Sequence, residues 1–157
     1  MPDMLVKLYE LGPVEPIIEQ QTAKGITIRR ALPPEKRAVV EWVADKFGNG
    51  WASECDVAFS NHPVSCFIAV ENDRIIGFAC YDATCKDFFG PTGVDESCRG
   101  KGTGKALLMA CMDALRAEGY GYAIIGGAGP VDFYSKAVGA TVIEGSTPGI
   151  YKGMLKV

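Results

Sequence analysis

The chain has 157 residues, of which 48% are apolar and 22% charged, and its formal net charge is −3. These values are typical of a single globular domain that is long enough to bury a substantial core. The negative balance disfavours nucleic acid as the main partner. Residues Met1–Leu11 lack the basic start and apolar stretch of a signal peptide, and no stretch approaches the roughly 18 apolar residues of a membrane span. We therefore expect a cytoplasmic protein without a membrane partner.

The N-terminal third is expected to hold two strands and two helices. Alternating residues predict a strand over Leu5–Tyr9, and a connection punctuated by glycine and proline follows it. Ile26–Arg30 alternates in the same way and predicts a second strand. Apolar residues at helical intervals predict a helix over Glu35–Phe47, and a short second helix is expected over Trp51–Phe59.

The middle of the chain is expected to be sheet. Ser65–Glu71 and Ile75–Tyr81 are apolar, β-rich runs joined by Asn72-Asp73-Arg74, which is a hairpin signal. Phe88–Val94 is a third such run, interrupted at Gly90-Pro91. An interruption of this kind predicts a bulge, or a place where another backbone or a ligand approaches closely.

The last third is expected to alternate helix and strand. A helix reaching about Glu118 precedes a buried strand over Tyr122–Ile125, and a short helix containing Phe133, Tyr134 and Val138 follows. Ala140–Glu144 and Gly149–Leu155 are expected to form a final strand pair. This order predicts a mixed α/β fold, with a mostly antiparallel sheet of about seven strands, one parallel pair and about four helices.

The cysteines give no metal-binding pattern. No two are spaced as Cys-x-x-Cys, and His62 is the single histidine, so the sequence predicts no zinc site. Several lie in apolar runs, where a thiol behaves as a small hydrophobe, and reduced buried thiols are expected. Cys98, beside a basic loop, is expected to be an exposed thiol. The cysteines are Cys55, Cys66, Cys80, Cys85, Cys98 and Cys111.

The most informative segment is Arg99–Gly104, which reads Arg-Gly-Lys-Gly-Thr-Gly and runs directly into a helical segment, Lys105–Leu115. Its glycines leave backbone N–H groups uncovered where a helix begins, and a helix start carries unpaired amides and partial positive charge. Arg99, Lys101 and Lys105 add formal charge at the same place. The segment therefore predicts a phosphate or pyrophosphate site.

Three phosphate-binding patterns compete for this loop. A nucleotide triphosphatase loop needs Ser or Thr after its lysine, but Ala106 follows Lys105 here. The dinucleotide pattern Gly-x-Gly-x-x-Gly has a different spacing and occurs early in a parallel fold. The third pattern, Arg-x-x-Gly-x-Gly between an interrupted strand and a long helix, is met in full by Arg99, Gly102 and Gly104.

The third pattern resembles that of the GNAT superfamily of acyl-CoA-dependent N-acyltransferases, and the resemblance extends over roughly Gly25–Leu155. Gly93–Leu108 is similar to the family's signature strand, loop and helix. Phe133–Ala140 is similar to its Phe-Tyr-x-Lys-x-Gly-Phe helix end, although it is one residue longer and has Ala140 in place of the final Phe. The resemblance implies one GNAT-like domain over 1–157, with 1–24 as an extra strand and connection, and a sheet splayed between its fourth and fifth strands.

The resemblance also implies how acetyl-CoA, as co-substrate and without a metal, is bound. The amides of Gly100–Gly104 would hold the pyrophosphate, the pantetheine arm would lie beside Thr92-Gly93-Val94, and the Val94 N–H would polarise the thioester carbonyl. The family's asparagine before the last helix is missing from Gly126–Pro130. The residues expected to contact coenzyme A are Thr92, Gly93, Val94, Arg99, Gly100, Lys101, Gly102, Thr103, Gly104, Lys105 and Tyr134.

For the chemistry, Tyr134 matches the family tyrosine that acts as general acid for the departing thiolate. Some relatives use a strand glutamate as general base, but this chain has Phe88 and Phe89 there. Asp82 and Glu54 are the candidate bases, with a water chain as the alternative. The residues expected to line the acceptor pocket are Trp51, Phe88, Phe89 and Tyr151.

These features predict an N-acetyltransferase in which a primary amine attacks acetyl-CoA directly. The acceptor stays open between a small metabolite, an antibiotic-like amine and a protein amino group. A non-catalytic acyl-CoA-binding or regulatory module is the main alternative, favoured by the missing strand carboxylate, and a nucleotide-binding enzyme is the third. A homodimer is expected from the habit of the family, and the strand at Leu5–Tyr9 is expected at a sheet edge or an interface.

Overall fold

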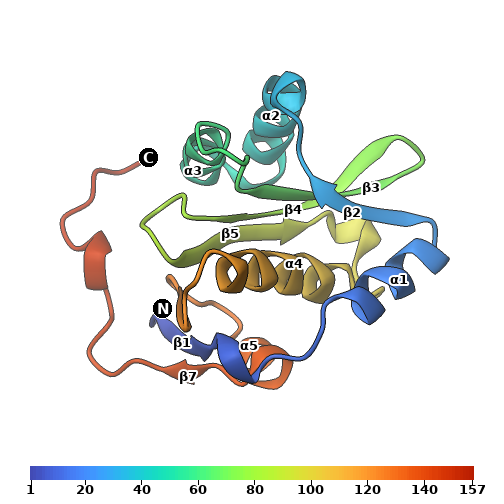
Figure 1. The fold of residues 1–157 in the computed structure, drawn as a ribbon. Helices are drawn as coiled ribbons and strands as arrows, with labels where there is room; N and C mark the ends of the chain where they lie inside the picture. Colours follow the sequence, from blue (N-terminus) through green and yellow to red (C-terminus); the bar gives the residue numbers. More distant parts are fainter.

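The computed structural model describes residues 1–157, and its centre is one sheet of seven strands in the order β2-β3-β4-β5-β6-β1-β7 (Figure 1). The strands are β1 (Met4–Lys7), β2 (Ile26–Arg30), β3 (Cys66–Glu71), β4 (Arg74–Tyr81), β5 (Phe88–Val94), β6 (Tyr122–Ile125) and β7 (Thr141–Val142). The α-helices are α1 (Glu15–Ala23), α2 (Lys36–Phe47), α3 (Asn49–Ala58), α4 (Thr103–Ala117) and α5 (Val131–Val138). Neighbouring strands are antiparallel except β5 and β6, so the predicted mixed α/β class is confirmed.

Helices cover both faces of the sheet. Helices α2 and α3 lie on one face, and α1, α4 and α5 lie on the other (Figure 1). Each face has its own apolar core: one packs α2 and α3 against β3 and β4, and the other is built around α4, which is buried along most of its length. No helix is long and apolar enough to cross a membrane.

The hairpin between β3 and β4 forms where the sequence predicts it. Its turn residues, Asn72 and Asp73, have φ angles of 52° and 60°. Positive φ at both central residues is the geometry of the type I′ turn, whose twist matches that of the flanking strands.

Strands β5 and β6 are paired only where β5 begins and β6 ends. Phe88 and Phe89 pair in parallel with Ile124 and Ile125, after which β6 ends and β5 continues beside β4 alone. The register between β4 and β5 is irregular opposite Gly90-Pro91, where a bulge was expected. The predicted splay of the sheet is therefore present and falls, in the labels of Figure 1, between β5 and β6.

The N-terminal segment departs from the prediction. Strand β1 does not lie at an edge of the sheet: it pairs with β6 on one side and with β7 on the other. The connection after it contains the unpredicted helix α1, so the chain has five α-helices where about four were expected. Pro16 fits the first turn of α1, where a missing N–H costs nothing.

The predicted C-terminal strand pair is wrong. Only β7 forms, and Gly149–Leu155 contains a single-turn 3₁₀ helix, η4 (Gly149–Tyr151), and no strand. Gly145, Gly149 and Gly153 have φ angles of 73°, 62° and 76°, which interrupt an extended run. Because β1 already pairs with β7, the segment after it is free to leave the sheet (Figure 1).

Candidate acyl-CoA site

A cleft of about 1350 Å³ opens where β5 and β6 diverge. One end is lined by the loop before α4, and the opposite end by α3 and the C-terminal segment. Small-molecule sites usually measure about 300–1,000 Å³, so the cleft has room for a long ligand together with a second, smaller one.

The loop end of the cleft presents an uninterrupted run of free backbone donors. The N–H groups of Arg99–Lys105 have no acceptor in the protein, and the residue preceding α4, Gly102, gives no side-chain cap. Gly100 and Gly102 have φ angles of 86° and 81°, a conformation that glycine adopts without strain. Free amides at the start of a buried 15-residue helix form an anion site.

A buried glutamine on α1 holds this loop in place. The Gln21 side chain is 2% exposed; its Nε2 donates to the carbonyl of Lys101 at 2.9 Å and its Oε1 accepts from Thr103 Oγ1 at 2.7 Å. Thr103 is itself 2% exposed. Gln21 was not predicted as a site residue because α1 was assigned to a connection, although Pro16 followed by a long run without glycine was a signal for a helix.

The three basic side chains of the loop have different positions. Arg99 and Lys105 line the cleft, and Arg99 Nε donates to the carbonyl of Val94 at 3.2 Å. Lys101 does not line the cleft; its Nζ lies 3.5 Å from a carboxylate oxygen of Glu71. Two of the three predicted cationic side chains therefore add to the positive electrostatic potential at the free amides of the loop.

The open edge of β5 presents further donors. Asp95 N–H donates to the carbonyl of Ile76 at 2.8 Å, which makes that pair a hydrogen-bonded one. Hydrogen-bonded and non-hydrogen-bonded pairs alternate in antiparallel sheets, so the N–H groups of Val94 and Thr92 point away from β4, toward the side where β6 has ended. Both residues line the cleft.

Tyr134, on α5, lies beside this edge. Tyr134 is 6% exposed and lines the cleft, and its ring packs edge-on against Phe89 at 6.3 Å between centroids. Its hydroxyl makes no hydrogen bond within the protein. Burial raises the pKa of Tyr134 to about 12. The phenol therefore stays protonated at neutral pH and is available as a donor.

At the opposite end of the cleft, the lining contains one acidic side chain, Glu54. It accepts a hydrogen bond from Thr84, and both side chains line the cleft. The hydroxyl of Tyr151, on η4, lies beside Gly126. The pKa of Tyr151 is raised, chiefly by burial and also by the nearby carboxylate of Glu54. Trp51 completes this end of the cleft.

Two predicted site residues lie elsewhere. Asp82, a candidate base, does not line the cleft; its Oδ1 accepts the N–H of Asp87 at 2.6 Å inside the turn between β4 and β5. Phe88 packs against Gly126 outside the lining. Successive strand residues face opposite sides of the sheet, so only Phe89 of the pair reaches the cleft. Of the residues predicted as base candidates or acceptor-pocket residues, the cleft lining brings together four: Glu54, Trp51, Phe89 and Tyr151.

The C-terminal segment forms a wall of which only Tyr151 was predicted from the sequence. The residues it adds to the lining are Thr147, Pro148, Ile150, Met154 and Val157. The start of this segment is tied to the N-terminus: Asp3 N–H donates to Ser146 Oγ at 2.8 Å, and Asp3 Oδ1 accepts the N–H of Gly127 at 2.8 Å. Because a strand was expected in this segment, the place of its residues in the cleft lining was not predicted.

Residues 36–139 match the family model described as the acetyltransferase (GNAT) family, so the match covers most of the chain and all of the anion loop. The chain belongs to the GNAT family. The recognition made from Arg99, Gly102 and Gly104 is thereby confirmed. A search of curated protein sequences finds no match.

Solved structures agree with the fold. The chain is similar to the glucosamine N-acetyltransferase region of a fungal multi-domain β-N-acetylglucosaminidase, with a TM-score of 0.74, 17% identity, and coverage of 90% of this chain and 19% of that one. It is also similar to a GCN5-related N-acetyltransferase from Sphaerobacter thermophilus, with a TM-score of 0.63, 22% identity, and coverage of 90% and 48%. The chain therefore spans about half of one relative and a fifth of the other.

Proposed function

We propose that the protein transfers an acetyl group from acetyl-CoA to a primary amine by direct attack. The observation that carries the proposal is the run of unpaired amides at the start of α4, which opens into the same cleft as the free edge of β5 and the unpartnered hydroxyl of Tyr134. Acetyl-CoA has a group for each of these features. Its pyrophosphate matches the amides, its amide-bearing pantetheine arm matches the edge of β5, and its thioester matches the Tyr134 hydroxyl.

The pyrophosphate would bind the amides of Gly100–Gly104, with the side chains of Arg99 and Lys105 neutralising its charge. The amide groups of the pantetheine arm would pair with the exposed edge of β5 at Val94, beside the loop, continuing the sheet where β6 has ended. Lys101 belongs to the loop through its backbone N–H, since its side chain faces Glu71.

Val94, to which the resemblance gives the thioester, lies beside the loop. At the thioester we therefore assign the free N–H of Thr92, nearer Phe89 and Tyr134, as the donor to the carbonyl oxygen on which negative charge develops during attack. The bond from the amine nitrogen to the carbonyl carbon forms, and the bond from that carbon to sulfur breaks. The hydroxyl of Tyr134, protonated because its pKa is about 12, donates to the departing sulfur. Glu54 is the carboxylate best placed to accept the proton of the amine, because Asp82 lies outside the cleft.

The charges of the lining also restrict the acceptor. Its charged side chains are Arg99 and Lys105, at the pyrophosphate end, and Glu54, at the other end among Trp51 and Tyr151. A protonated amine is attracted to this carboxylate, whereas an acceptor carboxylate would meet no cationic side chain there. We therefore expect an amine without a carboxylate, and glucosamine, for which the fungal N-acetyltransferase region is named, meets this condition.

The test is thiol release from acetyl-CoA over a panel of amines, with matched amino acids bearing a carboxylate. Tyr134→Phe should lower kcat by about a hundredfold and leave KM for acetyl-CoA nearly unchanged, because only the donor to the leaving sulfur is lost. Glu54→Gln should lower kcat and raise KM for the amine, because both the proton acceptor and the attraction for the ammonium are lost. Glu41→Gln, which changes an exposed carboxylate on α2, is its matched control.

Stabilisation by coenzyme A without turnover of any amine would favour the alternative, an acyl-CoA-binding module. Equal turnover by the wild-type protein and Tyr134→Phe would contradict the role given to the phenol. Preference for amino acids over amines without a carboxylate would contradict the role given to the charges at the acceptor end.

A further inference from the structure

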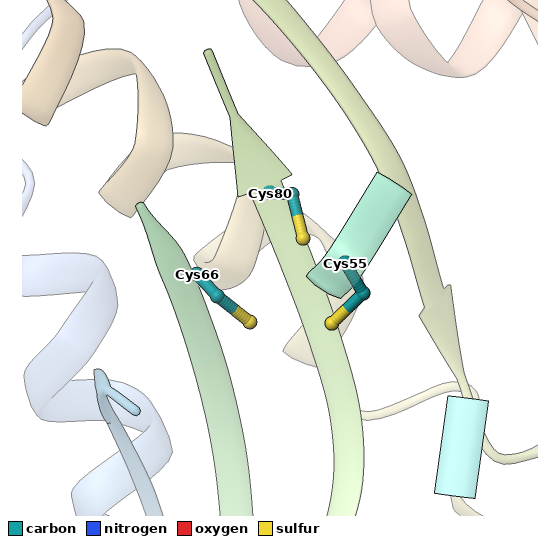
Figure 2. Close-up of side chains that lie close together, drawn as sticks. All are labelled: Cys55, Cys66 and Cys80. Carbon is teal, nitrogen blue, oxygen red and sulfur yellow. The ribbon is translucent and has the colours of Figure 1, made fainter. Parts of the chain in front are cut away.

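Three cysteine thiols converge in the core on the α2–α3 face of the sheet. Cys55 comes from α3, Cys66 from the start of β3 and Cys80 from β4, and Figure 2 shows their sulfur atoms directed into one common space. All three Sγ atoms lie within 4.8 Å of one another, and each residue is 0% exposed. The other three cysteines lie outside this cluster.

The cluster follows from the register of the hairpin and from the packing of α3. Cys66 and Cys80 are direct partners across β3 and β4. The neighbouring pair is hydrogen-bonded, since the N–H of Tyr81 donates to the carbonyl of Ser65 at 3.0 Å, so the cysteines form a non-hydrogen-bonded pair, in which side chains lie closest. Cys55 completes the group from α3, which packs on this face of the sheet (Figure 2).

The surroundings offer sulfur donors and no others. The three thiols lie in an apolar cluster with residues such as Val43, Phe78 and Ala52. No histidine or carboxylate joins the group, and no fourth thiol does.

We propose that Cys55, Cys66 and Cys80 form a three-sulfur site for the soft monovalent ion Cu(I). Soft thiolate donors select copper(I), zinc and iron–sulfur clusters, but structural zinc requires four ligands and the cluster supplies three. Three sulfurs at a metal–sulfur distance of about 2.3 Å lie about 4 Å apart when the metal is in their plane. The observed limit of 4.8 Å is within a small side-chain adjustment of that arrangement.

Binding is ligand exchange without a change of oxidation state. Each bond from Sγ to copper replaces an S–H bond, and the proton leaves to solvent. The bound ion would join α3 to β3 and β4, and α3 also carries Glu54 and Trp51 into the acceptor end of the cleft. The site therefore offers a way for copper to fix the acceptor wall, although its existence does not depend on the proposed acetyl transfer.

The test is anaerobic titration of the reduced, metal-free protein with Cu(I) against a chromophoric Cu(I) chelator. Cys85→Ser/Cys98→Ser/Cys111→Ser retains only the cluster and should bind one equivalent, with three sulfur ligands in its X-ray absorption spectrum. Cys55→Ala retains the cross-strand pair and should bind at least a hundredfold more weakly. Thermal unfolding with and without Cu(I) should show stabilisation of the first variant and not of the second.

Several results would overturn the proposal. They are the absence of copper binding by the variant that retains the cluster, equal binding by Cys55→Ala, or a spectrum with two sulfur ligands. If Cys55→Ala does not fold, the triple serine variant alone still tests the proposal. It must bind one Cu(I) per chain through three sulfur ligands, and any other stoichiometry or coordination number contradicts the site.

Discussion

Replacing Gln21 with alanine removes the side chain that joins α1 to the anion loop. The substitution deletes the acceptor for Thr103 Oγ1 and one donor to the carbonyl of Lys101. That carbonyl keeps a second donor, Lys24 Nζ at 2.8 Å, whereas the buried hydroxyl of Thr103 has no other partner. The loss is therefore concentrated at Thr103, the first residue of α4.

Leaving a buried hydroxyl unpaired costs about 1–3 kcal/mol, so we expect Gln21→Ala to lower the free energy of unfolding by about 2 kcal/mol. For a domain of this size, Tm should fall by about 4–8 °C. The substitution also leaves the loop amides without a fixed arrangement, which weakens the binding of acetyl-CoA. A loss of about 1.4 kcal/mol of binding free energy would raise KM for acetyl-CoA about tenfold. The value of kcat should change little, because Tyr134 is untouched.

The measurements are denaturant unfolding and steady-state kinetics with acetyl-CoA as the varied substrate. Gln20→Ala is the matched control, because it removes the same side chain from an exposed position on the same helix. Should the two variants unfold at the same denaturant concentration and share the wild-type KM, Gln21 would have no role in holding the loop.

Two further predictions concern stability. A Cβ on Gly93 would lie 2.5 Å from the Phe47 ring, so Gly93→Ala should lower the free energy of unfolding by about 1–3 kcal/mol, measured by denaturant unfolding. A Cβ on Gly121 would meet nothing within 4 Å, so Gly121→Ala should leave the stability unchanged. Equal effects of the two substitutions would contradict the packing argument. Burial, aided by Asp82, raises the pKa of Asp87 from 3.8 to about 6. The folded state then binds more protons than the unfolded state between these values, so stability should fall as pH rises through this range. Asp87→Asn should flatten that slope in unfolding measured from about pH 4 to pH 7, and an unchanged slope would refute the assignment.

The loop end of the candidate site could be predicted because its signals are local. Arg99, Gly102 and Gly104 lie within one loop, their backbone conformation is set by glycine, and the helix that follows is strongly periodic. Tyr134 was found through the helix pattern around it. The pairing of Phe88 with Ile124, and the splay after it, follow from the interruption at Gly90-Pro91.

The rest depends on contacts between distant parts of the chain. The role of Gln21 requires α1 to pack beside a loop 80 residues later, and no local pattern encodes that contact. The expectation that the sequence holds no zinc site considered the spacing of cysteines along the chain, whereas Cys55, Cys66 and Cys80 meet through sheet register and helix packing. Asp82 and Glu54 were indistinguishable as carboxylates until the fold placed them apart.

The position of β1 ties the order of assembly to the function. Met4 pairs with Ile125 on one side and Val142 on the other, so the first strand to be synthesised finds its partners only after nearly all of the chain exists. Contacts of such long sequence separation form slowly. Until they form, β7 has no strand to pair with, and Asp3 cannot anchor Ser146 at the root of the C-terminal wall. Completion of the sheet and closure of the acceptor end of the cleft are therefore a single folding event.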